Sequence, residues 1–169
     1  GISSVIVSRY SKNPQAFIDK IKSFGLGSPL GLDIEGEGTP RIKNITAKDW
    51  SSVVSLPWMS IGYETKLTPL QILAFYNAIA NNGTMVRPHF VKEIQSHGRT
   101  LKSFDTEIIR DSIASPAALA KARQLMEGVV ERGSAKQLNS SPYRIAGKTG
   151  TAQISMNKFG YDKTHPSYQ

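Results

Sequence analysis

The segment that most constrains the fold of this chain lies near its end, at residues 143–154. It reads Tyr-Arg-Ile-Ala-Gly-Lys-Thr-Gly-Thr-Ala-Gln-Ile, and its isoleucines and threonines favour an extended backbone. Gly147 and Gly150 weaken a strand, and glycines inside a strand usually mark a place where a ligand or another backbone comes close. The pattern therefore predicts a strand over about 143–155 with an open, glycine-flanked centre.

The centre of this segment carries residue types that bind an anion. Lys148 supplies a positive charge, and Thr149 and Thr151 supply hydroxyl donors. A phosphate-binding P-loop also ends in Gly-Lys-Thr, but it needs a glycine where this sequence has Pro142, and a helix where the strand pattern continues. Taken alone, the tripeptide is also compatible with a solvent-exposed strand end.

The composition narrows the function classes only a little. The 169 residues are enough for a single domain, 1–169, with a hydrophobic core. The net charge of +8 permits an anionic partner, but the 21 basic residues are scattered and form no run. No apolar run approaches the ~18 residues that span a bilayer, and the three histidines lack ligand spacing. We therefore expect no metal, no cofactor and no nucleic acid.

Capping signals divide the chain into helices and a hairpin. Asn13–Pro14 and Ser115–Pro116 each place a capping residue before a proline at the first helical position. Thr68 and Gln71 have the spacing of a capping box, and His97–Gly98 suits a hairpin turn. We expect helices over about 2–10, 14–24, 69–82 and 116–131 and a hairpin over about 86–105. The helix that follows Thr68 is apolar on most sides, which predicts deep burial.

A glycine-dense stretch, residues 25–40, follows the second predicted helix. Its acidic residues Asp33, Glu35 and Glu37 alternate in a way that invites comparison with a calcium-binding loop. The EF-hand pattern fails, because Pro40 interrupts it and Asn44 stands where it needs a glutamate. The sequence therefore predicts a turn-rich surface loop.

Several segments, taken in order, resemble the division-type class B penicillin-binding proteins. One is the Lys-Thr-Gly segment, which such enzymes combine with two serine-containing motifs. The others precede it with the order and spacing of that family. The matching segments are 24–27, 60–63, 67–71, 80–83, 125–130, 133–135 and 145–153.

The resemblance implies both a fold and an activity. The fold would be α+β, part of the β-lactamase/transpeptidase-like fold, with an antiparallel sheet that is covered by helices and incomplete in this chain. The activity would be that of a peptidoglycan D,D-transpeptidase, which cross-links stem peptides through a serine acyl-enzyme and also binds β-lactams. Lys148 and Thr151 would be catalytic, and Lys148, Thr149, Gly150 and Thr151 would bind the substrate. Division or elongation proteins would be partners, and the setting would be the periplasmic side of an anchored inner-membrane protein in the bacterial envelope.

The sequence departs from the family at the nucleophile. The one Ser-x-x-Lys, Ser155–Lys158, follows the Lys-Thr-Gly motif instead of preceding it, and the two Ser-x-Asn matches, at Ser11–Asn13 and Ser155–Asn157, are also misplaced. The first residues also start inside an apolar helical pattern. We therefore expect a fragment of a transpeptidase domain that is inactive alone. A β-lactamase or β-lactam-sensor domain and a non-enzymatic basic binding module remain as alternatives.

Overall fold

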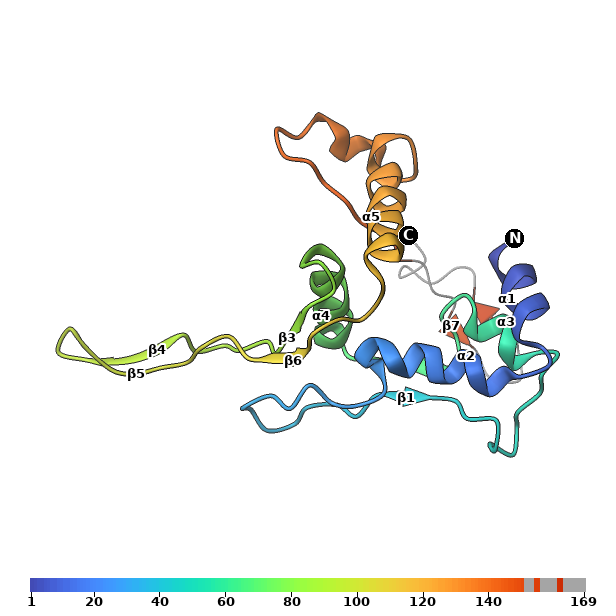
Figure 1. The fold of residues 1–169 in the computed structure, drawn as a ribbon, viewed down its shortest axis with the longest axis horizontal. Coiled ribbons are helices and arrows are strands. Elements are labelled where there is room, and N and C mark those ends of the chain that lie inside the picture. Colours follow the sequence, from blue (N-terminus) through green and yellow to red (C-terminus); the bar gives the residue numbers. More distant parts are fainter. Residues whose placement is uncertain (151–153, 156–160, 163–169) are drawn as a thin grey trace. The chain divides into compact units, whose positions relative to one another are not determined.

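The computed structural model describes residues 1–150, 154–155 and 161–162. The chain divides into two compact units, unit 1 (Gly1–Leu119) and unit 2 (Ala120–Gln169). Whether both units belong to one domain, as the sequence predicts, stays a prediction. The chain combines helices with short antiparallel strand pairs (Figure 1), in agreement with the predicted α+β class.

Unit 1 begins with two helices, α1 (Ile2–Tyr10) and α2 (Pro14–Ile21). The Asn13 side chain caps α2 as predicted, because its Oδ1 accepts the Ala16 N–H at 3.3 Å. The second helix ends earlier than the predicted residue 24 and continues as one π-helical turn, η1 (Lys22–Leu26). Gly25, at φ +87°, adopts the left-handed conformation that terminates helices.

The next two helices of unit 1 are α3 (Ser55–Met59) and α4 (Pro69–Ala80). The predicted capping box starts α4: Gln71 donates its backbone N–H to Thr68 Oγ1 at 3.2 Å, and the Thr68 N–H donates to Gln71 Oε1 at 2.8 Å. Gln71 is buried, and its Nε2 also donates to the Ser28 carbonyl oxygen at 3.2 Å. Gln71 thus ties the first turn of the helix to the glycine-dense loop. The apolar core of unit 1 consists of Ile18, Leu26, Leu30, Leu56, Met59, Ala74, Ala78, Ile79, Met85, Ile113 and Leu119.

The prediction that α4 is deeply buried is wrong for this chain. Leu73 is 61% exposed and Ile72 is 44% exposed, whereas Ala74, Ala78 and Ile79 are buried. Within unit 1, α4 packs against η1 and against β3 (Met85–Val86), so the side with Ala74, Ala78 and Ile79 faces the core and the side with Ile72 and Leu73 does not. An apolar sequence shows that a helix can be buried on several sides, but neighbouring elements decide which sides are.

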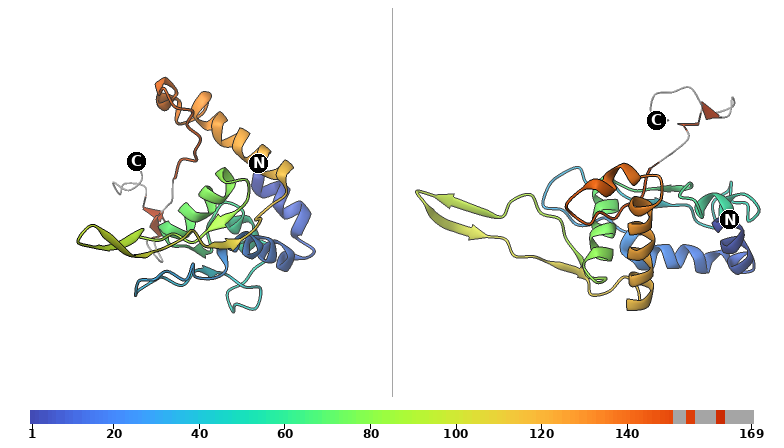
Figure 2. Two further views of the ribbon diagram at one scale, coloured as in Figure 1. Left: turned by 60° about the vertical axis from the view of Figure 1, so that its left-hand side comes forward. Right: turned by 90° about the horizontal axis from the view of Figure 1, so that it is seen from above.

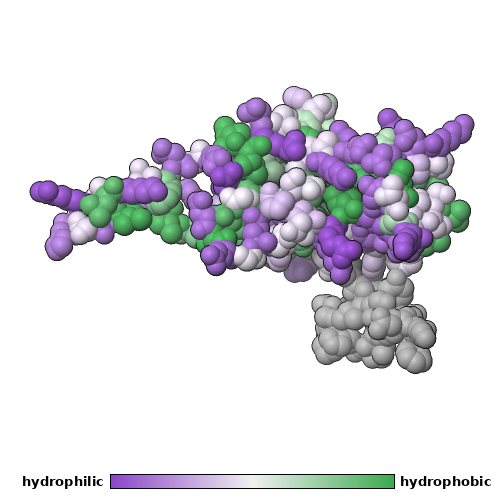
Figure 3. Space-filling view, turned by 90° about the horizontal axis from the view of Figure 1, so that it is seen from below, coloured by the Kyte–Doolittle hydropathy of each residue, from purple (hydrophilic) through white to green (hydrophobic). Residues whose placement is uncertain are grey.

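Four two-stranded antiparallel pairs form the described β-structure. The hairpin turn lies at His97 and Gly98, which have φ values of 48° and 74°, as a tight hairpin turn requires. Its strands, β4 (Glu93–Ser96) and β5 (Arg99–Ser103), form a ribbon that reaches away from the helices of unit 1 (Figure 2). Ile94 and Leu101 are exposed on this ribbon, and Figure 3 shows apolar surface, in green, at its left-hand end. The pairs are β1 (Arg41–Ile42) with β2 (Thr65–Lys66), β3 (Met85–Val86) with β6 (Ile108–Arg110), β4 (Glu93–Ser96) with β5 (Arg99–Ser103), and β7 (Ile154–Ser155) with β8 (Tyr161–Asp162).

A long helix, α5 (Pro116–Glu131), runs from unit 1 into unit 2, and a short 3₁₀-helix, η2 (Lys136–Ser140), follows it. Ser115 caps α5, since its Oγ accepts the Ala118 N–H at 3.3 Å. The strand expected over 143–155 is not formed in residues 144–150, which have no regular structure, whereas 151–153 lie outside the described residues and 154–155 form β7 (Ile154–Ser155). A strand exists only where a neighbouring strand pairs with its backbone groups, and among the described residues none pairs with 144–150.

Candidate functional site

The site is built at the C-terminal end of α5, where the chain reverses at Gly133. The Ala135 N–H donates to the Val129 carbonyl oxygen at 3.1 Å, which closes the end of the helix. A Cβ atom at Gly133 would lie 2.8 Å from the same oxygen and 2.9 Å from the Val129 Cα, so no side chain fits there. The glycine therefore allows the backbone to turn tightly, and Ser134 follows directly after the turn.

The Lys-Thr-Gly segment returns along the side of α5. The Gly147 N–H donates to the Met126 carbonyl oxygen at 3.2 Å, and Arg144 Nη2 lies 3.0 Å from Glu127 Oε1. The Arg144 side chain is 84% exposed, so this ion pair contributes at most about 1 kcal/mol. These contacts place the motif next to the helix end within unit 2.

The two segments meet in a pocket with a mixed polar and apolar lining. Ser134 Oγ lies 3.2 Å from Thr149 Oγ1, which is hydrogen-bond distance, and Lys148 Nζ donates to the Thr149 carbonyl oxygen at 2.8 Å. Arg132 adds a second cation. The pocket has a volume of about 370 Å³, and its lining is Gln124, Leu125, Gly128, Val129, Arg132, Gly133, Ser134, Lys148 and Thr149. Two cations and two hydroxyl groups around one small hollow suit an anion such as a carboxylate.

The predicted site residues are only partly brought together. Lys148 and Thr149 line the pocket, and Gly150 follows them with open space where a side chain would stand. Thr151 lies outside the described residues. Sequence reasoning missed Arg132 and Ser134 as pocket residues, although 133–135 was one of the segments that carried the family resemblance. No local sequence pattern distinguishes Ser134 from a surface serine. It lies fifteen residues before Thr149 in the sequence, and the two side chains come into contact only in the folded chain.

The misplaced serine motifs have ordinary structural surroundings where they can be described. Ser155 belongs to the two-residue strand β7, not to a helix start, and Lys158 lies outside the described residues. Asn13 is occupied as the cap of α2. Among the described residues, no cluster of histidine, cysteine, aspartate and glutamate side chains is suited to hold a metal ion.

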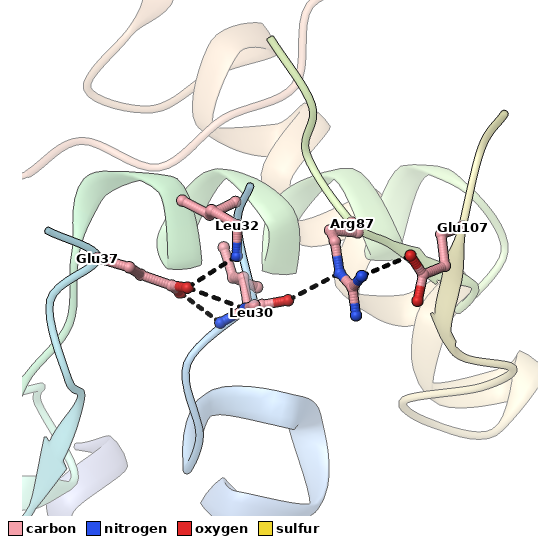
Figure 4. A network of polar contacts seen from close by, with 6 residues as sticks. Leu30, Leu32, Glu37, Arg87 and Glu107 are labelled. Carbon is pink, nitrogen blue, oxygen red and sulfur yellow. Dashed lines mark hydrogen bonds and ion pairs between the residues drawn. The ribbon is translucent and has the colours of Figure 1, made fainter. Parts of the chain in front are cut away.

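The acidic loop of unit 1 uses one carboxylate to fix its own backbone (Figure 4). Glu37 accepts the N–H groups of Leu30, Gly31 and Leu32, the last two at 2.9 Å. Burial raises the pKa of Glu37, but these three hydrogen bonds and the charge of Arg87 outweigh it, and the pKa lies below its ordinary value. The Glu37 carboxylate therefore stabilises the loop backbone.

Arg87 extends the same network to the strands of unit 1. Its Nε donates to the Leu30 carbonyl oxygen at 3.1 Å, and its Nη1 forms an ion pair with Glu107 (Figure 4). The loop is thus linked through one arginine to the segments on either side of the β4–β5 ribbon. The predicted turn-rich loop is present, and side-chain hydrogen bonds order it.

Comparison with known proteins decides the family. Residues 5–168 match the model of the penicillin binding protein transpeptidase domain. The chain belongs to this family. Its relatives confirm the class B resemblance. PbpB of Mycolicibacterium smegmatis is 33% identical over 148 residues, which cover 83% of this chain and 22% of the relative. MrdA of Haemophilus influenzae, a peptidoglycan D,D-transpeptidase, is 32% identical over 149 residues, which cover 79% of this chain and 22% of the relative.

Solved structures of the family agree with the fold. Penicillin-binding protein 3 of Mycobacterium tuberculosis in complex with ampicillin superimposes with a TM-score of 0.71 at 29% identity, over 89% of this chain and 34% of that one. The same protein with aztreonam gives a TM-score of 0.72 at 28% identity, over 89% and 35%. The chain spans about a fifth of the length of the curated relatives. Among the described residues, no helix has the length and apolar character needed to cross a bilayer.

Proposed function

We propose that this chain provides the substrate-recognition part of a serine-type D,D-transpeptidase that cross-links peptidoglycan stem peptides. The observation that carries the proposal is the pocket at the end of α5, where Lys148 and Thr149 of the family's Lys-Thr-Gly motif stand beside further polar groups. Family membership over nearly the whole chain supports it. The proposed ligand is the terminal carboxylate of a D-Ala-D-Ala peptide, or the carboxylate of a β-lactam.

Each residue of the motif has a role that follows from its chemistry. The Lys148 ammonium group attracts the carboxylate, and the Thr149 and Thr151 hydroxyl groups donate hydrogen bonds to it, which are strong because the acceptor is charged. The Gly150 position leaves the substrate backbone room to approach. The Thr151 N–H would form half of an oxyanion hole. The Lys148 charge would also lower the pKa of a nearby lysine base.

The proposed reaction needs a nucleophile that this sequence does not supply. A serine hydroxyl attacks a carbonyl carbon only when a neighbouring base takes its proton, and the family uses the lysine of a Ser-x-x-Lys motif at a helix start. Ser155 has no such setting. In the full-length protein, the nucleophile and base would therefore come from outside this segment, and the chain would contribute recognition.

The cellular setting follows from the same proposal. A peptidoglycan cross-linking domain works in the bacterial envelope, and we propose a periplasmic position in a protein anchored in the inner membrane. Division or elongation proteins are the proposed partners. The complexes of the related penicillin-binding protein 3 with ampicillin and aztreonam support β-lactams as ligands of the full-length protein.

Labelling with a fluorescent penicillin tests this assignment. We expect the 169-residue chain to remain unlabelled after denaturing electrophoresis, because it lacks an activated serine, whereas the full-length protein that contains this segment should be labelled covalently. The Ser155→Ala variant of the chain serves as the control. If the chain is labelled and the Ser155→Ala variant is not, Ser155 is the nucleophile and the assignment of the nucleophile to another segment is wrong. If the full-length protein is not labelled, the proposed function is wrong.

A further inference from the structure

We propose that Ser134 is a positioning residue for carboxylate binding, acting through the hydroxyl group of Thr149. The proposal rests on the proposed function of the pocket and adds a residue to it. Its basis is the contact of 3.2 Å between Ser134 Oγ and Thr149 Oγ1, in which either atom can be the donor. Ser134 therefore influences where the proton of Thr149 points.

The direction of this hydrogen bond is decided by what occupies the pocket. A threonine hydroxyl has one proton to donate and two lone pairs that accept. A carboxylate only accepts, so it requires the Thr149 proton to point toward it. Ser134 can then donate its own proton to Thr149 Oγ1, and the two hydroxyl groups form a chain from Ser134 through Thr149 to the ligand. Hydrogen bonds in such a chain polarise and strengthen one another.

The backbone holds Ser134 in place for this role from both sides. On one side, Gly133 packs so closely on Val129 that no side chain fits. On the other, Ala135 is buried, donates to the Val129 carbonyl oxygen at 3.1 Å and accepts the Leu138 N–H at 3.0 Å. The position of the Ser134 Cα thus depends on its neighbours, and its hydroxyl group is free to be oriented by Thr149.

The charges around the pair favour this arrangement over its reverse. Lys148 and Arg132 line the same pocket, so a carboxylate enters a cationic site. With an anion bound, a Thr149 proton that pointed to Ser134 would turn the Thr149 oxygen lone pairs toward the carboxylate and remove one of its donors, and lost hydrogen bonds to charged groups are costly. Ser134 can donate its proton to the Thr149 oxygen, so the Thr149 proton is available to the carboxylate.

A double-mutant cycle in the full-length protein that carries this segment tests the proposal. The measured quantity is the second-order rate constant of acylation by a fluorescent penicillin. We expect Ser134→Ala to lower it about threefold to tenfold, the size typical of one neutral hydrogen bond. Ser134→Thr should keep most of the rate because it keeps the hydroxyl group. In the Thr149→Val background, Ser134→Ala should have no further effect, because the group through which it acts is gone.

Two controls distinguish a positioning role of Ser134 from a loss of protein stability, and a failed wild-type reaction would concern the proposed function itself. Ser140→Ala removes an exposed hydroxyl group from η2 and should leave the rate unchanged, and the thermal unfolding midpoint of every variant should match that of the wild type. An undiminished rate in Ser134→Ala, an equal loss in Ser134→Thr, or an equal loss in the Thr149→Val background overturns the role of Ser134 alone. A wild-type protein that is not acylated overturns the proposed function, and the role of Ser134 with it.

Discussion

Replacing Lys148 with alanine in the full-length protein should lower the rate constant of acylation by penicillins about 10²–10³-fold, comparable to the loss of a donor aimed at developing negative charge. Lys148 lines the pocket at the end of α5 together with Thr149, and it places an ammonium group at the proposed carboxylate position. The alanine variant keeps the hydroxyl groups but loses the nearest positive charge on the motif. The measurement is the rate of covalent labelling as a function of penicillin concentration.

Two comparisons make this test specific for the charge at position 148. Lys136→Ala removes an exposed lysine from the adjacent η2 helix and should leave the rate constant close to that of the wild type. The advantage of the wild type over Lys148→Ala should also shrink at high salt, since salt screens exposed charges. Acylation of Lys148→Ala at the wild-type rate would contradict the assigned role of the lysine.

Replacing Glu37 with alanine should lower the free energy of unfolding of the chain by about 1–3 kcal/mol, the cost of leaving backbone donors without a partner. The carboxylate accepts hydrogen bonds from three successive N–H groups, those of Leu30, Gly31 and Leu32, and Leu30 belongs to the core of unit 1. Urea unfolding of the chain measures the change. Glu35→Ala, which removes an exposed carboxylate from the same loop, is the matched control and should change little.

The contribution of Glu37 should also depend on pH in a defined direction. Its pKa in the folded protein lies below the ordinary value of 4.5, so the carboxylate stabilises the fold fully above that value. The stabilisation is lost as the pH falls through the lower, folded pKa. The difference in unfolding free energy between the wild type and Glu37→Gln should therefore be largest near neutral pH and shrink on acidification. A difference that grows toward low pH would show that the charge of Glu37 opposes folding.

The sequence predicts best those features that short-range chemistry determines. The caps at Asn13, Thr68 and Ser115 need a side-chain oxygen and an N–H group three residues away, and both are fixed by the sequence itself. The turn at His97–Gly98 is equally local. These helix starts and the hairpin turn could therefore be placed without the structure, whereas the hairpin strands are shorter than the predicted 86–105, because Val86 pairs with Ile108 instead.

Features that depend on distant neighbours could not be placed in this way. The extended propensity of residues 144–150 is real, yet a strand also requires a pairing partner, and none among the described residues pairs with it. The exposed Leu73 shows the same limit for a helix. In the site, Lys148 and Thr149 were recognisable because their motif is contiguous, whereas Ser134 acquires its meaning from a contact across the fold.

The tight turn at Gly133 separates two kinds of mutational freedom at neighbouring positions. Any side chain at 133 collides with the backbone of Val129, so a change there alters the shape of the whole helix end. At 134 the backbone is set by its neighbours, and a substitution changes only the group that faces Thr149. Substitutions at position 134 can therefore change the affinity of the pocket for a carboxylate in small steps. A substitution at position 133 instead disrupts the helix end as a whole.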